Sequence, residues 1–408
     1  MEKYTPVLSK QYPEGFVNAP PKTTPITAEI LNNHEDALAA IEEFLEALPD
    51  IDLENLTVSN SISLGRKADT DIGKKSTAEG IDVTASSPYS HAEGDSTIAS
   101  GHTSHAEGYK TTAKGYTAHA EGNKTTARFS YSHAEGDSTE ASGSPSHAEG
   151  KNTTAAGNAS HAEGENTETG GDRAHAEGYM TMAGGDQAHA EGYSTIADGS
   201  TSHAEGYKTM ANGKYAHAEG EATSAEGNCT HAEGLNTTAS TYASHAEGNG
   251  TSAENYYAHA EGENTIASGL ASHAEGSSTT ASGPASHVEG SSTTASGAWS
   301  HAEGYHATVS GDYSHVQGKY NTEDTENKYA HIVGNGTADD ARSNAHTLDW
   351  YGNAWFAGDV YIGGTGQDDE NVKKLASEQY VLDQIAELRA TIEELNNKLN
   401  SLSSTASE

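Results

Sequence analysis

The stretch SHAEGDSTIASGHTSHAEGYKTTAKGYT, residues 90–117, holds two consecutive copies of a fourteen-residue unit. From His91 to His315 a histidine occupies every fourteenth position without a gap, seventeen in all. Sixteen of these histidines are followed two residues later by a glutamate, and the last one by Gln317. A disordered chain has no reason to keep one register over this length, so the pattern predicts a repeat architecture.

The composition excludes a conventional globular core. Of the 408 residues only 33% are hydrophobic, and the chain contains four Phe, four Met and three Trp. Low hydrophobicity combined with a net charge of −38 would ordinarily indicate disorder. Because the repeat argues against disorder, we expect the backbone to be satisfied by neighbouring repeats rather than by large buried side chains.

The same features exclude several partners. Protonation of all seventeen repeat histidines would raise the net charge only from −38 to −21, so phosphate would still repel the chain and we expect no nucleic-acid partner. No segment reaches the roughly 18 consecutive apolar residues of a membrane helix, so we expect no membrane partner. The N-terminus lacks the apolar stretch of a signal peptide, and the single cysteine, Cys229, excludes an intrachain disulfide.

The repeat unit predicts the fold. Aligned as S-H-A-E-G-x-x-T-x-A-x-G-x-x, it divides into two halves, each with small residues at every second position before a glycine. This is the pattern of a short strand followed by a tight turn. Two strands and two turns make one circuit of a coil, here called a rung, and each strand pairs with its counterparts in adjacent rungs. We therefore predict a mainly β fold, a parallel β-roll (solenoid) that is about 80 Å long at roughly 4.8 Å per rung.

Alternation along each strand assigns the side chains to two faces. Ser, Ala and Thr point into the coil, and the repeating threonines from Thr97 to Thr293 therefore do not form an ice-binding surface. The outward positions of the second half vary freely, as at Ile98, Glu140 and Met182. The outward positions of the first half are held to His and Glu, so we expect an equally repetitive partner there. The simplest such partner is another copy of the chain.

Three chains around a common axis would bring these histidines and glutamates together, and we predict a homotrimer. The trimer-axis residues are named the His–Glu stripe here: His91, Glu93, His105, Glu107, His119, Glu121, His133, Glu135, His147, Glu149, His161, Glu163, His175, Glu177, His189, Glu191, His203, Glu205, His217, Glu219, His231, Glu233, His245, Glu247, His259, Glu261, His273, Glu275, His287, Glu289, His301, Glu303 and His315. Hydrogen bonds from His to Glu, within one chain or between chains, would satisfy both groups.

Metal binding is an alternative role for the stripe. Three imidazoles on an axis suit Zn²⁺ or Ni²⁺, and three carboxylates suit a harder cation. A hydrogen-bonded stripe accounts for the same pattern, so we expect no metal or cofactor and keep a metal-binding β-solenoid as the alternative. If the histidines are buried in the neutral form, acid should loosen the trimer. If glutamate instead raises the histidine pKa, the stabilisation should be present below about 6.5.

We expect no enzymatic activity and predict no catalytic residue. One preorganised pocket outperforms many shallow ones, whereas the His-x-Glu pair occurs in sixteen equivalent copies. No nucleophile stands apart from the repeat.

The chain is predicted to have four segments. Residues 1–50 form an attachment segment with an amphipathic helix, and residues 51–345 form the β-roll. Residues 346–364 form a small aromatic β region, expected to be a packed cap. Residues 365–408 form a linker and a C-terminal coiled coil that associates the chains. The predicted coiled-coil seam consists of Val381, Ile385, Leu388, Ile392, Leu395, Leu399 and Leu402.

Tyrosines recur at two positions of the repeat. They follow the glycine of the first half at Tyr109, Tyr179, Tyr193, Tyr207 and Tyr305, and they lie two residues before a stripe histidine at Tyr89, Tyr131, Tyr215 and Tyr257. Such rows can stack on sugars, but capping of the edge of the roll is their commoner use.

The unit resembles that of a known family. A left-handed parallel β-roll with units of the form S-x-A-x-G-x-x-S-x-A-x-G is similar to the head of trimeric autotransporter adhesins, in which aliphatic residues line the trimer axis. His105 and Glu107 stand in such positions here, and Val333, in the glutamate position, and Val288 and Val316, beside their histidines, support the comparison. The SHAEG form and the segment ARSNAHTLDWYGNAWFAGDVYIGG resemble tail fibre or minor structural proteins of phages that infect Gram-positive bacteria.

This resemblance implies a structural trimeric fibre in the tail of a virion or a tail-derived particle. The N-terminal segment would bind a tail or baseplate protein, and one end would hold or form the contact with a host-surface receptor, with a saccharide as one candidate. A cell-surface adhesin of a Gram-positive bacterium is the alternative.

Overall fold

The computed structural model describes residues 62–66, 72–358, 360–362, 373–374 and 378–405. The chain divides into two units, Met1–Ile62 and Ser63–Glu408, and the account below concerns the second. The predicted attachment segment, residues 1–50, lies outside the described residues.

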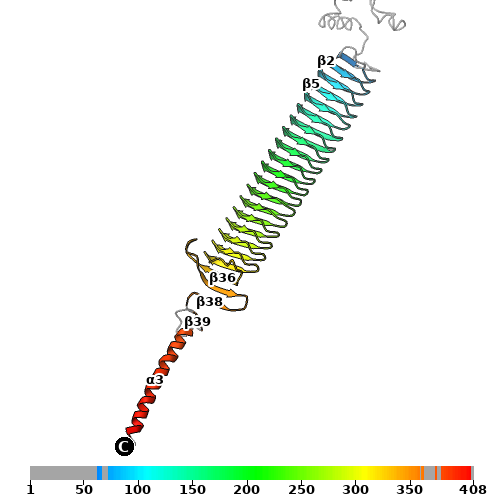
Figure 1. Cartoon of the computed structure of the whole chain (residues 1–408). Helices are drawn as coiled ribbons and strands as arrows, with labels where there is room; N and C mark the ends of the chain where they lie inside the picture. The colour runs from blue at the N-terminus through cyan, green and yellow to red at the C-terminus, as the bar shows by residue number, and fades with distance from the viewer. Residues whose placement is uncertain (1–61, 67–71, 359, 363–372, 375–377, 406–408) are drawn as a thin grey trace, which may run out of the picture. The chain divides into compact units, whose positions relative to one another are not determined.

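The second unit contains the predicted parallel β-solenoid with fourteen-residue spacing (Figure 1). Each regular rung has one long strand and one strand of two residues. After β1 (Ile62–Arg66), the long strands are β2 (Thr77–Ala85), β3 (His91–Asp95), β5 (His105–Tyr109), β7 (His119–Asn123), β9 (His133–Asp137), β11 (Ser146–Lys151), β13 (Ser160–Glu165), β15 (His175–Tyr179), β17 (His189–Tyr193), β19 (His203–Tyr207), β21 (His217–Glu221), β23 (His231–Leu235), β25 (His245–Asn249), β27 (His259–Glu263), β29 (His273–Ser277), β31 (His287–Ser291), β33 (His301–Tyr305) and β35 (His315–Lys319).

Long strands pair in parallel with long strands, and short strands with short strands. The short strands are β4 (Ile98–Ala99), β6 (Thr112–Ala113), β8 (Thr126–Ala127), β10 (Glu140–Ala141), β12 (Thr154–Ala155), β14 (Glu168–Thr169), β16 (Met182–Ala183), β18 (Ile196–Ala197), β20 (Met210–Ala211), β22 (Ser224–Ala225), β24 (Thr238–Ala239), β26 (Ser252–Ala253), β28 (Ile266–Ala267), β30 (Thr280–Ala281), β32 (Thr294–Ala295) and β34 (Thr308–Val309).

The predicted division of side chains between two faces is confirmed. Ala92, Thr97 and Ala99 are fully buried between the two strands of their rung, while His91 of the same rung is half-buried on the outer surface. The interior is filled by alanine, serine and threonine because the two strands leave room only for small groups. Each rung buries its face against its neighbours, as expected for a solenoid.

The interior of the coil also contains two valines that replace alanine in the first half of the fourteen-residue unit. Val288 and Val316 occupy the alanine position and are 0% and 1% exposed. They enlarge the core and do not line the outer stripe, so their use as support for an aliphatic axis was wrong. Val333, by contrast, lies opposite Gln317 in the register and does continue the outer column of glutamates.

Serine closes the turn that leads into the long strand. The Ser104 hydroxyl donates a hydrogen bond of 2.7 Å to the carbonyl of Gly101, and Ser202 makes the same bond to Gly199 at 2.6 Å. Serine is suited to this position because its buried hydroxyl can donate a hydrogen bond to the backbone carbonyl three residues earlier and so stabilise the turn.

The two glycines of the unit have different roles, and the second is replaced in some rungs, for example by Phe129 and Thr241. The first is the penultimate residue of the long strand and has positive φ, for example 109° at Gly150. The second, for example Gly171, has an ordinary φ, but a Cβ there would overlap the carbonyl oxygen of Gly185 in the next rung. The glycines therefore set both the turn and the close spacing of rungs.

The turns also use left-handed residues other than glycine, which the sequence pattern did not predict. Lys110 has φ of 56° and Tyr131 has φ of 61°. The Lys110 amide donates to the carbonyl of Asp95 at 2.8 Å, and the Tyr131 amide donates to Tyr116 at 2.8 Å. Each strained turn is therefore held by a hydrogen bond to the preceding rung.

The repeat ends in a different structure. After a sixteen-residue step, His331 of β36 (Tyr329–Asn335) pairs with His315. The Asn321 amide both accepts a hydrogen bond from the Thr308 N–H and donates to the Thr308 carbonyl, each at 2.8 Å, so it replaces a further short strand. The strand β37 (Asn344–Asp349) then pairs antiparallel with β36, and β38 (Ala354–Phe356) pairs antiparallel with β37.

The expected packed cap is only partly realised. Trp350, Trp355 and Phe356 are 46%, 51% and 55% exposed, and Tyr351 is 92% exposed. Antiparallel strands do cover the last parallel edge, but the aromatic side chains of this region remain at the surface. Without large apolar residues in the small-residue interior of the roll, these rings have no core to enter.

The C-terminal elements are β39 (Tyr361–Ile362), β40 (Lys373–Lys374) and the helix α3 (Glu378–Thr405). The predicted seam lies on this helix, and Val381, Ile385, Leu388, Ile392, Leu395 and Leu399 are all 41–64% exposed in the single chain. The side chain of Leu402 lies outside the described residues. Among the described residues, no helix has the length and apolar character needed to cross a membrane.

Candidate functional site: the His–Glu stripe

The solenoid stacks the stripe residues directly on one another. In the register of β11 and β13, His147 pairs with His161 and Glu149 with Glu163. From His91 to His315 the centroids of successive imidazole rings lie 4.6–5.0 Å apart. Most of these rings are nearly parallel, with an interplanar angle of 3° between His147 and His161. The sequence period thus becomes two continuous columns, one of imidazoles and one of carboxylates.

The stripe is half-buried in the single chain. Where a His–Glu pair lies within 4.0 Å, the imidazole is 35–41% exposed and the carboxylate 31–54% exposed. The imidazole Nε2 atoms are more shielded than the rings as a whole. Sixteen of the seventeen have no solvent contact and no hydrogen-bond partner within the described chain: those of His91, His105, His119, His133, His147, His161, His175, His189, His203, His217, His245, His259, His273, His287, His301 and His315.

Contacts between histidine and glutamate within one chain are long. In the first part of the solenoid, Nε2 faces the glutamate of its own strand, and the distance is 3.9 Å between His147 and Glu149. The shortest of these His–Glu contacts in the described residues, 3.3 Å between His231 and Glu233, is a hydrogen bond. In the last rungs Nε2 turns to the glutamate of the preceding rung, for example His315 to Glu303 at 3.7 Å. Hydrogen bonding between chains stays a prediction.

Burial and the charges of stacked neighbours favour the neutral form of several of these imidazoles. Burial, followed by the charges of the two adjacent imidazoles, lowers the pKa of His133 below its ordinary value of 6.5. The same causes lower the pKa of His105, His175, His203, His245 and His273, and burial with the charge of one adjacent imidazole lowers the pKa of His301 and His315. Neighbouring glutamates oppose the shift but do not reverse it. A neutral imidazole offers a lone pair and is the form that ligates metals.

The carboxylates interact with one another near the end of the stripe. Burial and hydrogen bonds to Glu289 and Glu261 raise the pKa of Glu275. Hydrogen bonds from Glu303 and Glu275 lower the pKa of Glu289, and the bond to Glu289 raises the pKa of Glu303. These three stacked carboxyl groups therefore hold protons unequally, as like charges in one column require.

Adjacent rungs bring metal-ligating atoms together. Five groups have three ligand atoms that all lie within 4.8 Å of one another: His133–Glu135–His147, His147–Glu149–His161, His259–Glu261–His273, His301–Glu303–His315 and Glu275–His287–Glu289. Each is formed within one chain, whereas the sequence suggested ligands converging from three chains on an axis.

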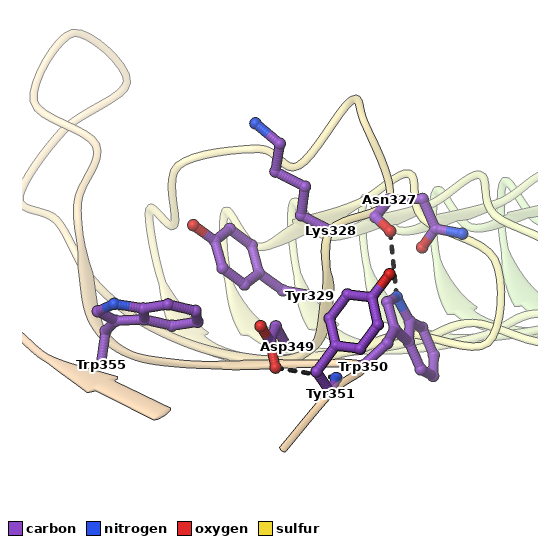
Figure 2. A pocket seen from close by; sticks show the side chains of 7 residues that line it. All are labelled: Asn327, Lys328, Tyr329, Asp349, Trp350, Tyr351 and Trp355. Atoms are coloured by element: carbon purple, nitrogen blue, oxygen red, sulfur yellow. Dashed lines mark hydrogen bonds between the residues drawn. The ribbon is translucent and has the colours of Figure 1, made fainter. Parts of the chain in front are cut away.

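A second site lies where the repeat ends. A pocket of about 340 Å³ is lined by Asn327, Lys328, Tyr329, Asp349, Trp350, Tyr351 and Trp355. Figure 2 shows Asp349 between the side chains of Trp350 and Trp355. The Trp350 indole donates to the Asn327 carbonyl at 3.1 Å, and Asp349 accepts from the amide N–H of Tyr351 at 2.9 Å, which fixes the hairpin. The sequence identified the aromatic cluster but not Asn327 or Lys328, because only the return of β37 onto β36 brings them together.

Three consecutive tyrosines of the row that follows the first glycine stack on one another. The rings of Tyr179, Tyr193 and Tyr207 lie 5.0 and 5.1 Å apart, with interplanar angles of 19° and 21°. Their faces are therefore covered by one another, and mainly edges and hydroxyl groups meet solvent. This arrangement favours the expected role along the edge of the roll over stacking on sugars.

No protein-family model matches this chain. No curated protein matches it significantly either.

Proposed function

We propose that the chain is the structural subunit of a homotrimeric fibre in the tail of a phage or of a tail-derived particle. The observation that carries the proposal is the uniformity of the stripe on an otherwise variable surface. Seventeen rungs keep histidine at one outer position, while the outer position of the short strand changes freely. Solvent imposes no such uniformity, but parallel copies of the same chain do.

The C-terminal helix supports the same proposal independently. Six apolar residues of the predicted seam are 41–64% exposed along α3 in the single chain. A helix with such an apolar stripe is stabilised by packing against identical helices. Chains joined by this helix would have their solenoids in parallel and in register, which the stripe requires. The left-handed sense of the roll is part of the proposal.

The mass of the full-length chain in solution tests the assembly. Light scattering after size exclusion should return three times the chain mass of 42.4 kDa. A stable single chain at micromolar concentration would refute the trimer. A dimer would also refute the trimer, because two stripes would then face each other across a twofold axis.

A phage tail is preferred over a bacterial surface because of the repeat itself. The SHAEG form and the aromatic segment at residues 341–364 resemble tail fibre proteins more than adhesins. In this proposal, residues 1–50 attach to a tail or baseplate protein, and the fibre acts outside the cell. Neighbouring tail and lysis genes would support this assignment, whereas a neighbouring sortase or secretion system would favour the adhesin.

The pocket at the end of the repeat is the candidate receptor contact. Its two indoles, two phenols, and the charged groups of Lys328 and Asp349 are the combination that binds saccharides, with ring faces for stacking and polar groups for hydroxyls. Binding of full-length protein to an array of bacterial surface glycans should be lost in Trp355→Ala. The matched control is Phe356→Ala, since Phe356 is similarly exposed but does not line the pocket. Equal loss in both variants would argue against the pocket.

A further inference from the structure

We propose that the His–Glu stripe binds transition-metal dications such as Zn²⁺ or Ni²⁺ at sites that one chain completes by itself. Each site takes ligands from two adjacent rungs. In four of the five groups these are the histidine and glutamate of one rung and the histidine of the next. The proposal does not depend on the trimer, because all three ligands belong to one chain.

The geometry lies close to that of a metal site. In the first group the ligand atoms of His133, Glu135 and His147 are all within 4.8 Å of one another. Ligands that bind one Zn²⁺ tetrahedrally at about 2.0–2.1 Å lie about 3.4 Å apart, so a closure of at most about 1.4 Å is needed. Side-chain rotation can supply this closure without moving the paired backbone. A water molecule or a group of another chain can take the fourth position.

The unsatisfied imidazole nitrogens are an independent observation. The Nε2 atoms of all eight histidines in the five groups are shielded from solvent and have no hydrogen-bond partner within the described chain. A buried polar atom without a partner is costly and indicates a missing water or ion. Six of these atoms face a glutamate oxygen at 3.5–3.9 Å, which is too long for a strong charge-assisted bond. An ion between the two groups would satisfy both.

The charge of the stripe selects a cation. The stripe stacks sixteen glutamates in register on a chain of net charge −38. Imidazole and carboxylate ligands together favour borderline metals such as Zn²⁺, Ni²⁺ and Cu²⁺ over Mg²⁺ or Ca²⁺. A dication bound between two rungs would reduce the electrostatic repulsion between the stacked carboxylates.

Shared ligands limit how many sites fill together. His147 belongs to two of the five groups, and the other three share no residue with them or with one another. Four of the five groups can therefore be occupied at once. We expect four ions per chain at saturation.

Equilibrium dialysis of the full-length chain, without a histidine tag, against Zn²⁺ tests this stoichiometry, with bound metal measured by mass spectrometry. His147→Gln removes both groups that share it, so binding should fall from four ions to three. Glu149→Gln removes only the second group and should leave four, because His133–Glu135–His147 remains. His102→Gln, outside the stripe, should also leave four. Substitution by Co²⁺ should give the visible absorption of a nitrogen- and oxygen-ligated ion.

Absence of Zn²⁺ binding by the folded chain would overturn the proposal. So would an equal loss in His147→Gln and His102→Gln, because that result would indicate nonspecific binding. Circular dichroism confirms that each variant is folded, and the mass of each sample is measured in parallel. A single chain that binds four ions would refute the trimer and retain the metal sites. A trimer without bound metal would refute the metal sites and retain the trimer.

Discussion

The imidazole of His301 lies on that of His315, one rung later, with ring centroids 4.7 Å apart and planes within 6° of parallel. Burial and the charge of an adjacent imidazole lower the pKa of both rings. Two imidazolium ions at this distance repel each other, so protonation of one ring disfavours protonation of the next. This property governs how the protein responds to acid.

We predict that the melting temperature falls as the pH decreases below 6.5. The folded-state pKa of eight stripe histidines lies below the unfolded value, so the unfolded chain binds more protons in this range. Their stabilisation is complete above 6.5 and is lost as the pH falls through the folded pKa. The raised pKa values of Glu275 and Glu303 oppose this loss only at lower pH, near 4.5.

Thermal melts followed by circular dichroism between pH 4.5 and 8 measure this dependence. Replacement of His105, His133 and His175 with Gln should reduce it, whereas His102→Gln, outside the stripe, should leave it in place. A melting temperature that is higher at pH 5 than at pH 7.5 would contradict the prediction and indicate that glutamate stabilises the charged imidazole.

Adjacent glycines should differ sharply in their tolerance of alanine. A Cβ at Gly171 would overlap the carbonyl oxygen of Gly185, whereas a Cβ at Gly170 would meet its nearest atoms at an ordinary 3.6 Å. Gly171→Ala should therefore cost about 1–3 kcal/mol or more, since paired rungs cannot separate locally. Gly170→Ala should be neutral or stabilise by about 0.4–1 kcal/mol. Denaturant unfolding of the two variants gives the comparison, and equal stabilities would argue against the rung spacing.

The interior threonine hydroxyl is expected to be dispensable. Thr153 is fully buried, and its Oγ1 has no hydrogen-bond partner within the described chain. Thr153→Val keeps the shape and removes an unsatisfied polar atom, so the free energy of unfolding should stay constant or rise by up to about 1 kcal/mol. Ser160→Ala is the matched control, because the Ser160 hydroxyl donates to the Gly157 carbonyl at 2.7 Å and its removal should lower stability by about 1 kcal/mol. Destabilisation by Thr153→Val would show that the hydroxyl has a partner.

Helix α3 should determine association. Leu388 is 60% exposed in the single chain and lies in the middle of the predicted seam. Leu388→Asp would bury a charge between helices and should shift the sedimenting species toward the monomer. Asn397→Asp adds the same charge off the seam and should leave the mass unchanged. An unchanged mass in both variants would exclude the helix from the interface.

Regular backbone pairing is what made much of the fold predictable. Every rung repeats one pattern. Alternation of side chains along the strands of one unit therefore predicts the buried position of Thr97 and the outer position of His91, and the same positions in all other rungs. The left-handed turn at Lys110 was not predictable, because lysine has no preference for positive φ. It is imposed by the hydrogen bond to the preceding rung.

The sequence by itself determined the period, the small-residue interior and the identity of the outer stripe, because these depend only on alternation and on side-chain size. Tertiary structure alone decided that His133, Glu135 and His147 share one site and that Asn327 meets Trp350 in a pocket. The winding of the coil and the antiparallel return at β37 bring these residues within a few ångströms of one another. No local sequence pattern specifies such distances between residues of different strands.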